Sequence, residues 1–260
     1  MLKIITSLTL LLFGMLAKGQ VSENRTISEF SKVAISGGIE LIYSENPKVS
    51  LQVVSNNPEI AKNTITEVDG KTLKIYLTEG NQLAANDIVK VYVSAPHIDA
   101  LKAGSNAKIT IIERLNASKM NIVLESGATL TGNIKTSGKT KLTAKQNTLF
   151  NGKIEALALE GNFKSNAKIN LTGNAKNASF QTYDGSLLAA RNFIASNIKL
   201  SAYGKSKSTI YANTKIDVNV ADEASVIYTG FPEEIVLNEE AESFKKINYK
   251  QSISYNDATK

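Results

Sequence analysis

Residues 101–130 read LKAGSNAKITIIERLNASKMNIVLESGATL, and the pattern of this stretch recurs along the chain as far as Gly230. Each copy has a β-rich phrase, a turn of small residues, a second β-rich phrase and then Gly or Asn. One column of aliphatic residues follows the small turn at steps of 16 to 23 residues: Ile109, Leu130, Leu149, Ile169, Leu187, Ile210 and Val226. A second column lies just upstream: Leu101, Leu124, Leu142, Leu159, Phe180, Leu200 and Val220.

A repeat of about 20 residues is typical of stacked coils, none of which can bury its apolar side alone. Residues 122–124 and 218–220 place apolar side chains at every second position, which favours strands, and Gly, Asn and Ser end each phrase before helical length. A leucine-rich repeat has a similar period, but its fixed leucine spacing and asparagine ladder are not found here. The sequence therefore predicts an all-β fold, a right-handed parallel β-helix of about 20 residues per coil. Leu149 is expected in its core, where an Asp would unfold the body.

The first 19 residues have the organisation of a signal peptide. Lys3 precedes an apolar run over residues 4–16, and Ala17 and Gly19 place small residues at the cleavage-site positions. The run is shorter than a membrane-spanning helix needs, and no later apolar segment approaches that length. We therefore expect cleavage before Gln20 and export of the chain. The absence of Cys argues against disulfides and against a lipid anchor on an N-terminal cysteine.

The sequence pattern predicts four segments. Residues 1–19 are the signal peptide, and residues 20–100 form a β-rich N-terminal cap or the first coils, with a hairpin over 65–77 around Asp69-Gly70. Residues 101–230 form the repeat body, and residues 231–260 form a C-terminal cap and tail.

Several phrases resemble a known family. The strand that ends in VAISGGI (33–39), the hairpin before Pro96, and recurring phrases such as LESGATL (124–130) are similar to the putative auto-transporter adhesin, head GIN domain family. The resemblance covers about residues 27–230. It implies an exported β-helix protein of a Gram-negative bacterium, in the periplasm, at the outer-membrane surface or outside the cell. It implies adhesion by name only and brings no site residues.

Candidate catalytic residues are few. His97 is the single histidine, follows Pro96 between two strands, and has only Asp99 as a nearby acid, so we interpret it as an ordinary loop residue. Placed in register, Glu125 and Glu160 would stand two coils apart on one face, without a partner base. Phosphate-binding loops and calcium motifs are not found. We expect no enzyme, no metal and no cofactor, with a polysaccharide lyase or hydrolase as the alternative.

Charge is distributed unevenly. Residues 101–230 hold 15 Lys and 2 Arg against 8 acidic residues, whereas both flanking segments are net acidic. One interpretation is attraction to an acidic polymer, such as envelope polysaccharide or lipid head groups. The spread of the lysines over most coils favours the other interpretation, that lysines at outward sheet positions discourage aggregation between edges. Nucleic acid is not expected as a partner, because no recognition motif is found. Tyr183 and Tyr203 should point outward on adjacent coils, as a sugar-binding platform or as a ladder that packs on itself.

Three functions follow as hypotheses. The first is an exported, non-enzymatic envelope or cell-surface protein that engages a partner, such as another envelope protein, through a sheet face. The second is a protein that binds or cleaves an acidic glycan in a lateral groove. The third is a structural scaffold of the periplasm. Converging carboxylates would favour the second hypothesis, and a flat face of Thr, Asn and Lys the first or third.

Overall fold

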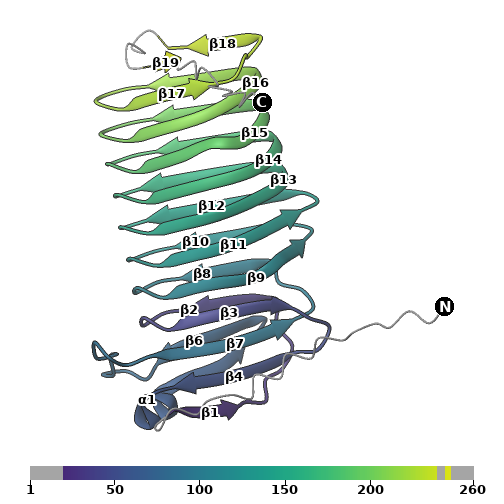
Figure 1. Cartoon of the computed structure of the whole chain (residues 1–260), viewed down its shortest axis with the longest axis vertical. Coiled ribbons are helices and arrows are strands. Elements are labelled where there is room, and N and C mark those ends of the chain that lie inside the picture. The colour runs from purple at the N-terminus through teal and green to yellow at the C-terminus, as the bar shows by residue number, and fades with distance from the viewer. Residues whose placement is uncertain (1–19, 239–243, 247–260) are drawn as a thin grey trace, which may run out of the picture.

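A computed structural model describes residues 20–238 and 244–246, so the expected signal peptide and most of the expected tail lie outside the described residues. The described chain is a solenoid of about seven turns, in which parallel strands are stacked coil on coil (Figure 1). It is nearly all β, with 66% strand and 3% helix, which confirms the predicted class and the stacked parallel coils.

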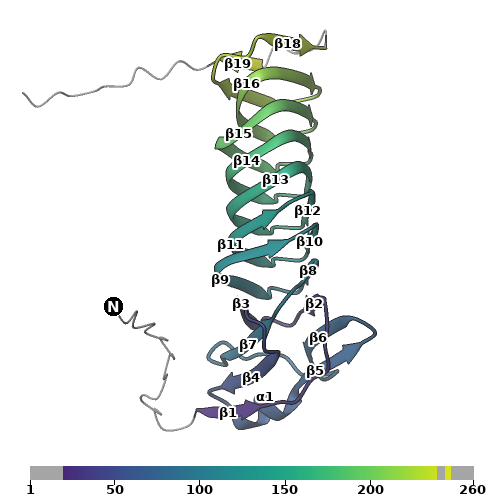
Figure 2. The same cartoon turned by 90° about the vertical axis from the view of Figure 1, so that its right-hand side faces the viewer.

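Each coil contributes one strand to each of two facing sheets, as Figure 2 shows from the side. The first sheet stacks four short strands: β2 (Lys32–Ile35), β8 (Ala100–Ala103), β10 (Met120–Leu124) and β12 (Lys139–Lys145). The second sheet stacks β3 (Glu40–Glu45), β9 (Lys108–Ala117) and β11 (Thr129–Thr136). Four long strands then run through both sheets: β13 (Leu149–Lys164), β14 (Lys168–Thr182), β15 (Leu187–Ala202) and β16 (Lys207–Val220). The described stack ends with β17 (Ser225–Thr229), β18 (Glu234–Leu237) and β19 (Phe244–Lys246).

Four-residue connections reverse the chain from the first sheet to the second, and together they form one narrow side of the solenoid, the turn edge. From β8 onward the connections are 104–107, 125–128, 145–148, 164–167, 183–186, 203–206 and 221–224, of which the third and fourth include the last residue of the preceding strand. In the first five, both central residues have φ values between 47° and 76°, the left-handed region that Asn, Asp and Gly tolerate best. Backbone hydrogen bonds also join neighbouring turns, as from the Asn106 N–H to the Ser126 carbonyl at 2.8 Å. The small-residue turns of the sequence therefore make the corners of the coils.

The core lies between the two sheets and runs the length of the stack. It is mainly aliphatic, with four fully buried phenylalanines on the three successive long strands β13, β14 and β15: Phe150, Phe163, Phe180 and Phe193. The rings of Phe163 and Phe180 are 6.2 Å apart, and Gly161 lies beside both. A Cβ at Gly161 would stand 2.4 Å from the Phe163 ring, so the glycine makes room for the aromatic pair.

The strand register corrects two members of the first aliphatic column. Phe150, not Leu149, pairs with Leu130 and Ile169 in the buried column, so the expectation that Leu149 is a core residue was wrong. At Leu187 the same error of one residue occurs, because Leu188 is buried and Leu187 is 39% exposed. A shift of one residue turns a strand side chain to the opposite face.

Other members of the two columns are shifted by two residues and stay buried. Leu142 pairs with Ile122 and Gly161, not with Leu124 and Leu159. Val218, not Val220, pairs with Leu200, and Ser208, not Ile210, pairs with Leu188. Since the side-chain period of a strand is two, each of these residues keeps its inward direction.

The N-terminal region continues the stack and then closes it. The strands β2 and β3 pair in parallel with β8 and β9, so they form a coil of the same solenoid. Beyond them lie β1 (Val21–Asn24), β4 (Ser50–Ser55), α1 (Pro58–Asn63), β5 (Thr64–Asp69), β6 (Thr72–Leu77) and β7 (Val89–Ala95). Here β1, β4 and β7 pair antiparallel, and β5 and β6 form the expected hairpin. Antiparallel strands and a helix cover this end of the solenoid, as open stacks require.

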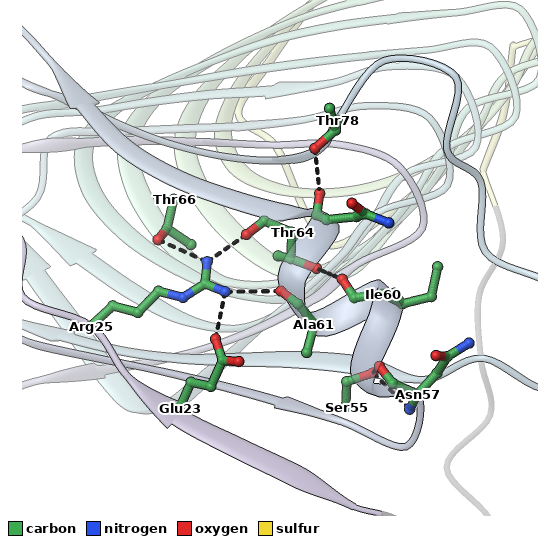
Figure 3. Close-up of polar contacts among 10 residues, drawn as sticks. Glu23, Arg25, Ser55, Asn57, Ile60, Ala61, Thr64, Thr66 and Thr78 are labelled. Carbon is green, nitrogen blue, oxygen red and sulfur yellow. Dashed lines mark hydrogen bonds and ion pairs between the residues drawn. The ribbon is translucent and has the colours of Figure 1, made fainter.

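Arg25 joins β1 to the helix of this cap (Figure 3). Its guanidinium donates to the carbonyl oxygens of Ala61 and Thr64 at the C-terminal end of α1, and it pairs with Glu23 at 2.8 Å. At the other end of the helix, the Asn57 side chain accepts a hydrogen bond from the Glu59 N–H. Side chains thus provide hydrogen-bond partners for backbone groups at both ends of this short helix.

Candidate functional site

The turn edge brings Tyr183 and Tyr203 together. Each begins a four-residue turn, and the hydrogen-bonded registers next to them place the two residues on adjacent coils. Their ring centroids are 5.1 Å apart with an interplanar angle of 14°, so the rings are stacked. The Nζ atom of Lys164, one coil earlier, lies 4.7 Å from the Tyr183 centroid. Both faces of Tyr183 are therefore occupied, by a cation and by an aromatic ring.

Tyr203 ends this aromatic column. The next residue at the same turn position is Ala221, whose methyl group is too small to cover the ring. The Tyr203 hydroxyl accepts a hydrogen bond from Asn219 Nδ2 at 3.1 Å, which holds the ring in place. Of the sugar-binding platform expected from the sequence, the parts left for contact with a ligand are the ring edges, the hydroxyls and the side of Tyr203 toward Ala221.

A shallow depression of about 900 Å³ lies along the turn edge, on the side of the second sheet. We call it the lysine groove; among its lining residues are Leu149, Asn166, Lys168, Leu187, Lys205 and Lys207. The strand register aligns Leu149, Lys168, Leu187 and Lys207 in one outward column, in which leucine and lysine alternate from coil to coil. The sequence columns contained the two leucines but assigned them to the core, so the groove was missed.

Six lysines on the sheet faces pair with three glutamates, whereas the two lysines of this column do not pair with an acid in the described part of the chain. Lys102 and Lys145 pair with Glu125, Lys139 and Lys141 pair with Glu160, and Lys135 and Lys153 pair with Glu155. Within residues 20–238 and 244–246, Lys168 and Lys207 have no acidic side chain at ion-pairing distance. Positive charge is therefore neutralised around these three glutamates, whereas, among the described residues, Lys168 and Lys207 leave unpaired positive charge in the lysine groove.

The carboxylates of the faces are held in ionised form by these lysines. Hydrogen bonds from Lys145 lower the pKa of Glu125, and those from Lys153 and Lys139 lower the pKa of Glu155 and Glu160. Glu125 stands at a turn beside Lys145, whereas Glu160 is aligned with Lys141 in the first sheet, so the two acids do not share a column. A carboxyl group that donates a proton near neutral pH needs a raised pKa, and these three have the opposite shift.

His97 is exposed in the connection between β7 and β8, as interpreted from the sequence. Among the described residues, no group of three or more His, Cys, Asp or Glu side chains is placed to hold a metal ion. No helix in the described part of the chain is long and apolar enough to cross a membrane.

The first sheet carries a regular polar row beside the tyrosines. The register aligns five outward residues on five successive coils, Thr143, Asn162, Gln181, Ser201 and Asn219, which we call the polar row. Asn162 Nδ2 donates to Gln181 Oε1 at 2.9 Å, which orders part of the row. Neighbouring members are one strand spacing apart, about 4.8 Å. The result is a continuous row of hydroxyl and amide groups on the outer side of the first sheet.

The chain is similar to known proteins in both sequence and fold. The sequence model of the family described as putative auto-transporter adhesin, head GIN domain, matches residues 29–232. A solved structure of a putative adhesin from Parabacteroides distasonis is similar, with a TM-score of 0.75, 16% identity and coverage of 88% of this chain and 97% of that chain. A putative adhesin from Parabacteroides merdae has a TM-score of 0.73 at 16% identity, with coverage of 89% and 98%.

A third structure, described as a putative lipid binding protein from Parabacteroides distasonis, has a TM-score of 0.70 at 20% identity and covers 89% of this chain and 98% of its own. At these identities the likeness shows a shared fold. No curated protein matches the chain.

Proposed function

The chain belongs to the putative auto-transporter adhesin, head GIN domain family, whose sequence model spans residues 29–232, and from this premise we propose a non-enzymatic surface adhesin. The resemblance stated from the sequence motifs is thereby confirmed. In this proposal residues 1–19 direct export, the N-terminal cap closes the stack, and the repeat body presents the binding surface at the outer membrane.

The observation that carries this proposal is the polar row. Asn162, Gln181 and the other members of the row stand on five successive coils, and the sheet below them is held rigid by parallel pairing and a buried core. A rigid surface loses little conformational entropy when a partner binds. Amide and hydroxyl groups both donate and accept hydrogen bonds, so a flat array of them suits a partner with many polar groups.

Two further points favour binding over catalysis. The carboxylates Glu125, Glu155 and Glu160 have lowered pKa values and lysine partners, which suits them to ion pairing between coils. The depressions along the body are shallow, whereas catalytic sites commonly enclose much of the substrate. Tyr183 and Tyr203 are proposed as an aromatic border of the surface, with contact through the ring edges and the Tyr203 side toward Ala221.

The surface location is tested by protease treatment of intact cells that express the tagged protein, with a periplasmic protein as control. Loss of the tag while the control stays intact is the expected result. Full protection of the tag would confine the protein behind the outer membrane and would contradict the surface proposal in favour of a periplasmic scaffold.

The binding surface is tested with beads that carry the purified protein. Asn162→Ala/Gln181→Ala removes two neighbouring amides of the polar row, and Asn151→Ala/Asn170→Ala removes two neighbouring amides of the second sheet. We expect attachment of beads to intact bacterial or epithelial cells to fall at least fivefold for the first pair alone. Equal attachment by both variants would remove the polar row from the proposal.

A further inference from the structure

We infer that the lysine groove binds a linear acidic polysaccharide, laid along the solenoid axis over the turn edge. This inference rests on the proposed binding function and names the class of ligand for one surface of it. The groove crosses several successive coils, from Leu149 to Glu223, so its long direction follows the stack and not a single coil.

The first argument is the distribution of free charge. The described sheet-face lysines that flank Glu125, Glu155 and Glu160 satisfy internal carboxylates. Lys168 and Lys207 have exposed side chains with no acidic partner among the described residues. The neighbouring members of the same column, Thr129 before Leu149 and Ser225 after Lys207, are neutral. Unpaired cations in a hollow attract carboxylate or sulfate groups from outside the molecule.

The second argument is the spacing along the column. Lys168 and Lys207 are two coils apart, which places their Cα atoms about 10 Å from each other. Leu187 lies between them and is 39% exposed. An acidic polysaccharide has the complementary pattern, because its charged groups recur at intervals and the sugar rings between them have apolar C–H faces.

The third argument comes from the rim of the groove. Lys205 is 3.8 Å from Glu223, and both side chains are largely exposed, so this ion pair is weak and can exchange for a ligand carboxylate. Asn166, on the same rim, offers an amide for sugar hydroxyls. Tyr203 begins the turn that contains Lys205, so its open side borders the same edge.

The test uses purified protein and three probes of similar length: polygalacturonate, dextran sulfate and neutral dextran. Lys168→Gln/Lys207→Gln removes the two free charges of the groove. Lys119→Gln/Lys176→Gln is the matched control, because it removes two exposed lysines that also lack an acidic partner among the described residues and lie outside the groove. The two variants have the same net charge and therefore the same non-specific attraction to a polyanion.

We expect the wild type to bind at least one acidic probe and not neutral dextran, with binding that weakens as salt rises. The groove variant should lose at least tenfold in affinity, and the control variant should change less than about twofold. Equal losses in both variants would overturn the inference, because net charge alone would then explain binding.

If neither polygalacturonate nor dextran sulfate binds, the inference is also overturned. Binding that depends on Lys168 and Lys207 but occurs only on vesicles of anionic phospholipid overturns it as well, since this result would assign the groove to a lipid surface. In either case the protease and bead experiments remain separate, so the groove can fail while the adhesin proposal stands.

Discussion

Phe150 and Leu149 are neighbours in β13 with opposite environments. Phe150 is fully buried between Leu130 and Ile169, whereas Leu149 pairs with Thr129 and Lys168 on the outer side. We predict that Phe150→Ala lowers the free energy of unfolding by about 3–5 kcal/mol, because it leaves a cavity in the stacked core. Leu149→Ala should lower it by less than about 1 kcal/mol. Urea denaturation of both variants measures the difference, and comparable losses would contradict the register.

Gly173 illustrates a close approach that only glycine permits. It has a φ of +109°, and a Cβ there would lie 2.1 Å from the carbonyl oxygen of Ile154 on the neighbouring coil. Gly70 in the β5–β6 hairpin also has positive φ, but nothing lies within 4 Å of its Cβ position.

The two glycines make a matched pair for substitution. Gly70→Ala should lower stability by about 1 kcal/mol through backbone strain alone. Gly173→Ala adds a clash with backbone and should lower stability by about 3 kcal/mol or more. Thermal unfolding of both variants provides the measurement. If the two variants had the same melting temperature, the coils at Gly173 would be able to move apart without cost, which would contradict the prediction.

At the scale of elements, the helix α1 depends on the side chain of Arg25, which directly follows β1. Six residues are too few for a stable helix in water, so tertiary contacts must hold α1 in place. Arg25 supplies such contacts at the C-terminal carbonyls, where a cation also complements the helix dipole (Figure 3).

We predict that Arg25→Ala raises hydrogen exchange in α1 and β5 at least tenfold and leaves exchange in β13–β16 unchanged. Lys62→Ala is the control, since Lys62 makes only an exposed ion pair with Glu59 at 3.2 Å in the same helix. Exchange is measured by mass spectrometry of peptides. Equal exchange in the two variants would mean that packing of Ile60 and Ala61, not the guanidinium, holds the helix.

At the scale of the whole molecule, ion pairs join coils along the stack. Glu125 lies between Lys102 and Lys145 of the two neighbouring coils, and the pKa values of Glu125, Glu155 and Glu160 are lowered from 4.5. A carboxyl group with a lowered folded-state pKa stabilises the fold above its unfolded pKa. That contribution is lost as pH falls through the folded-state value.

The melting temperature should therefore be level from pH 7 to about 5 and should fall on acidification below about 4.5. A variant that carries Glu125→Gln, Glu155→Gln and Glu160→Gln should start lower at neutral pH and lose less on acidification, because it has three fewer groups to protonate. Calorimetry at several pH values is the measurement. If the melting temperatures of the wild type and the variant fell by the same amount on acidification, these ion pairs would not contribute to the pH dependence of stability.

Much of the architecture was predictable from local chemistry. Alternation at 122–124 and 218–220 predicts strands, small turns predict corners, and the period of about 20 residues predicts stacked coils. The Tyr183–Tyr203 stack was also predictable, because each tyrosine lies three residues after an inward residue, Phe180 or Leu200, so alternation turns both outward at equivalent positions. Each of these inferences depends on local patterns and on their recurrence along the chain, and none requires the pairing between coils.

Sequence alone thus determined the strands, the corners, the coil period and the family of this protein, since each follows from local residue patterns that recur along the chain. The tertiary structure decided the register between coils, because coils of unequal length align only when their backbones pair. Register in turn decided that Phe150 is buried and Leu149 is not, and that Glu160 meets Lys139 and Lys141. It also left Lys168 and Lys207 without acidic partners among the described residues, since an ion pair between coils exists only where stacking brings opposite charges together.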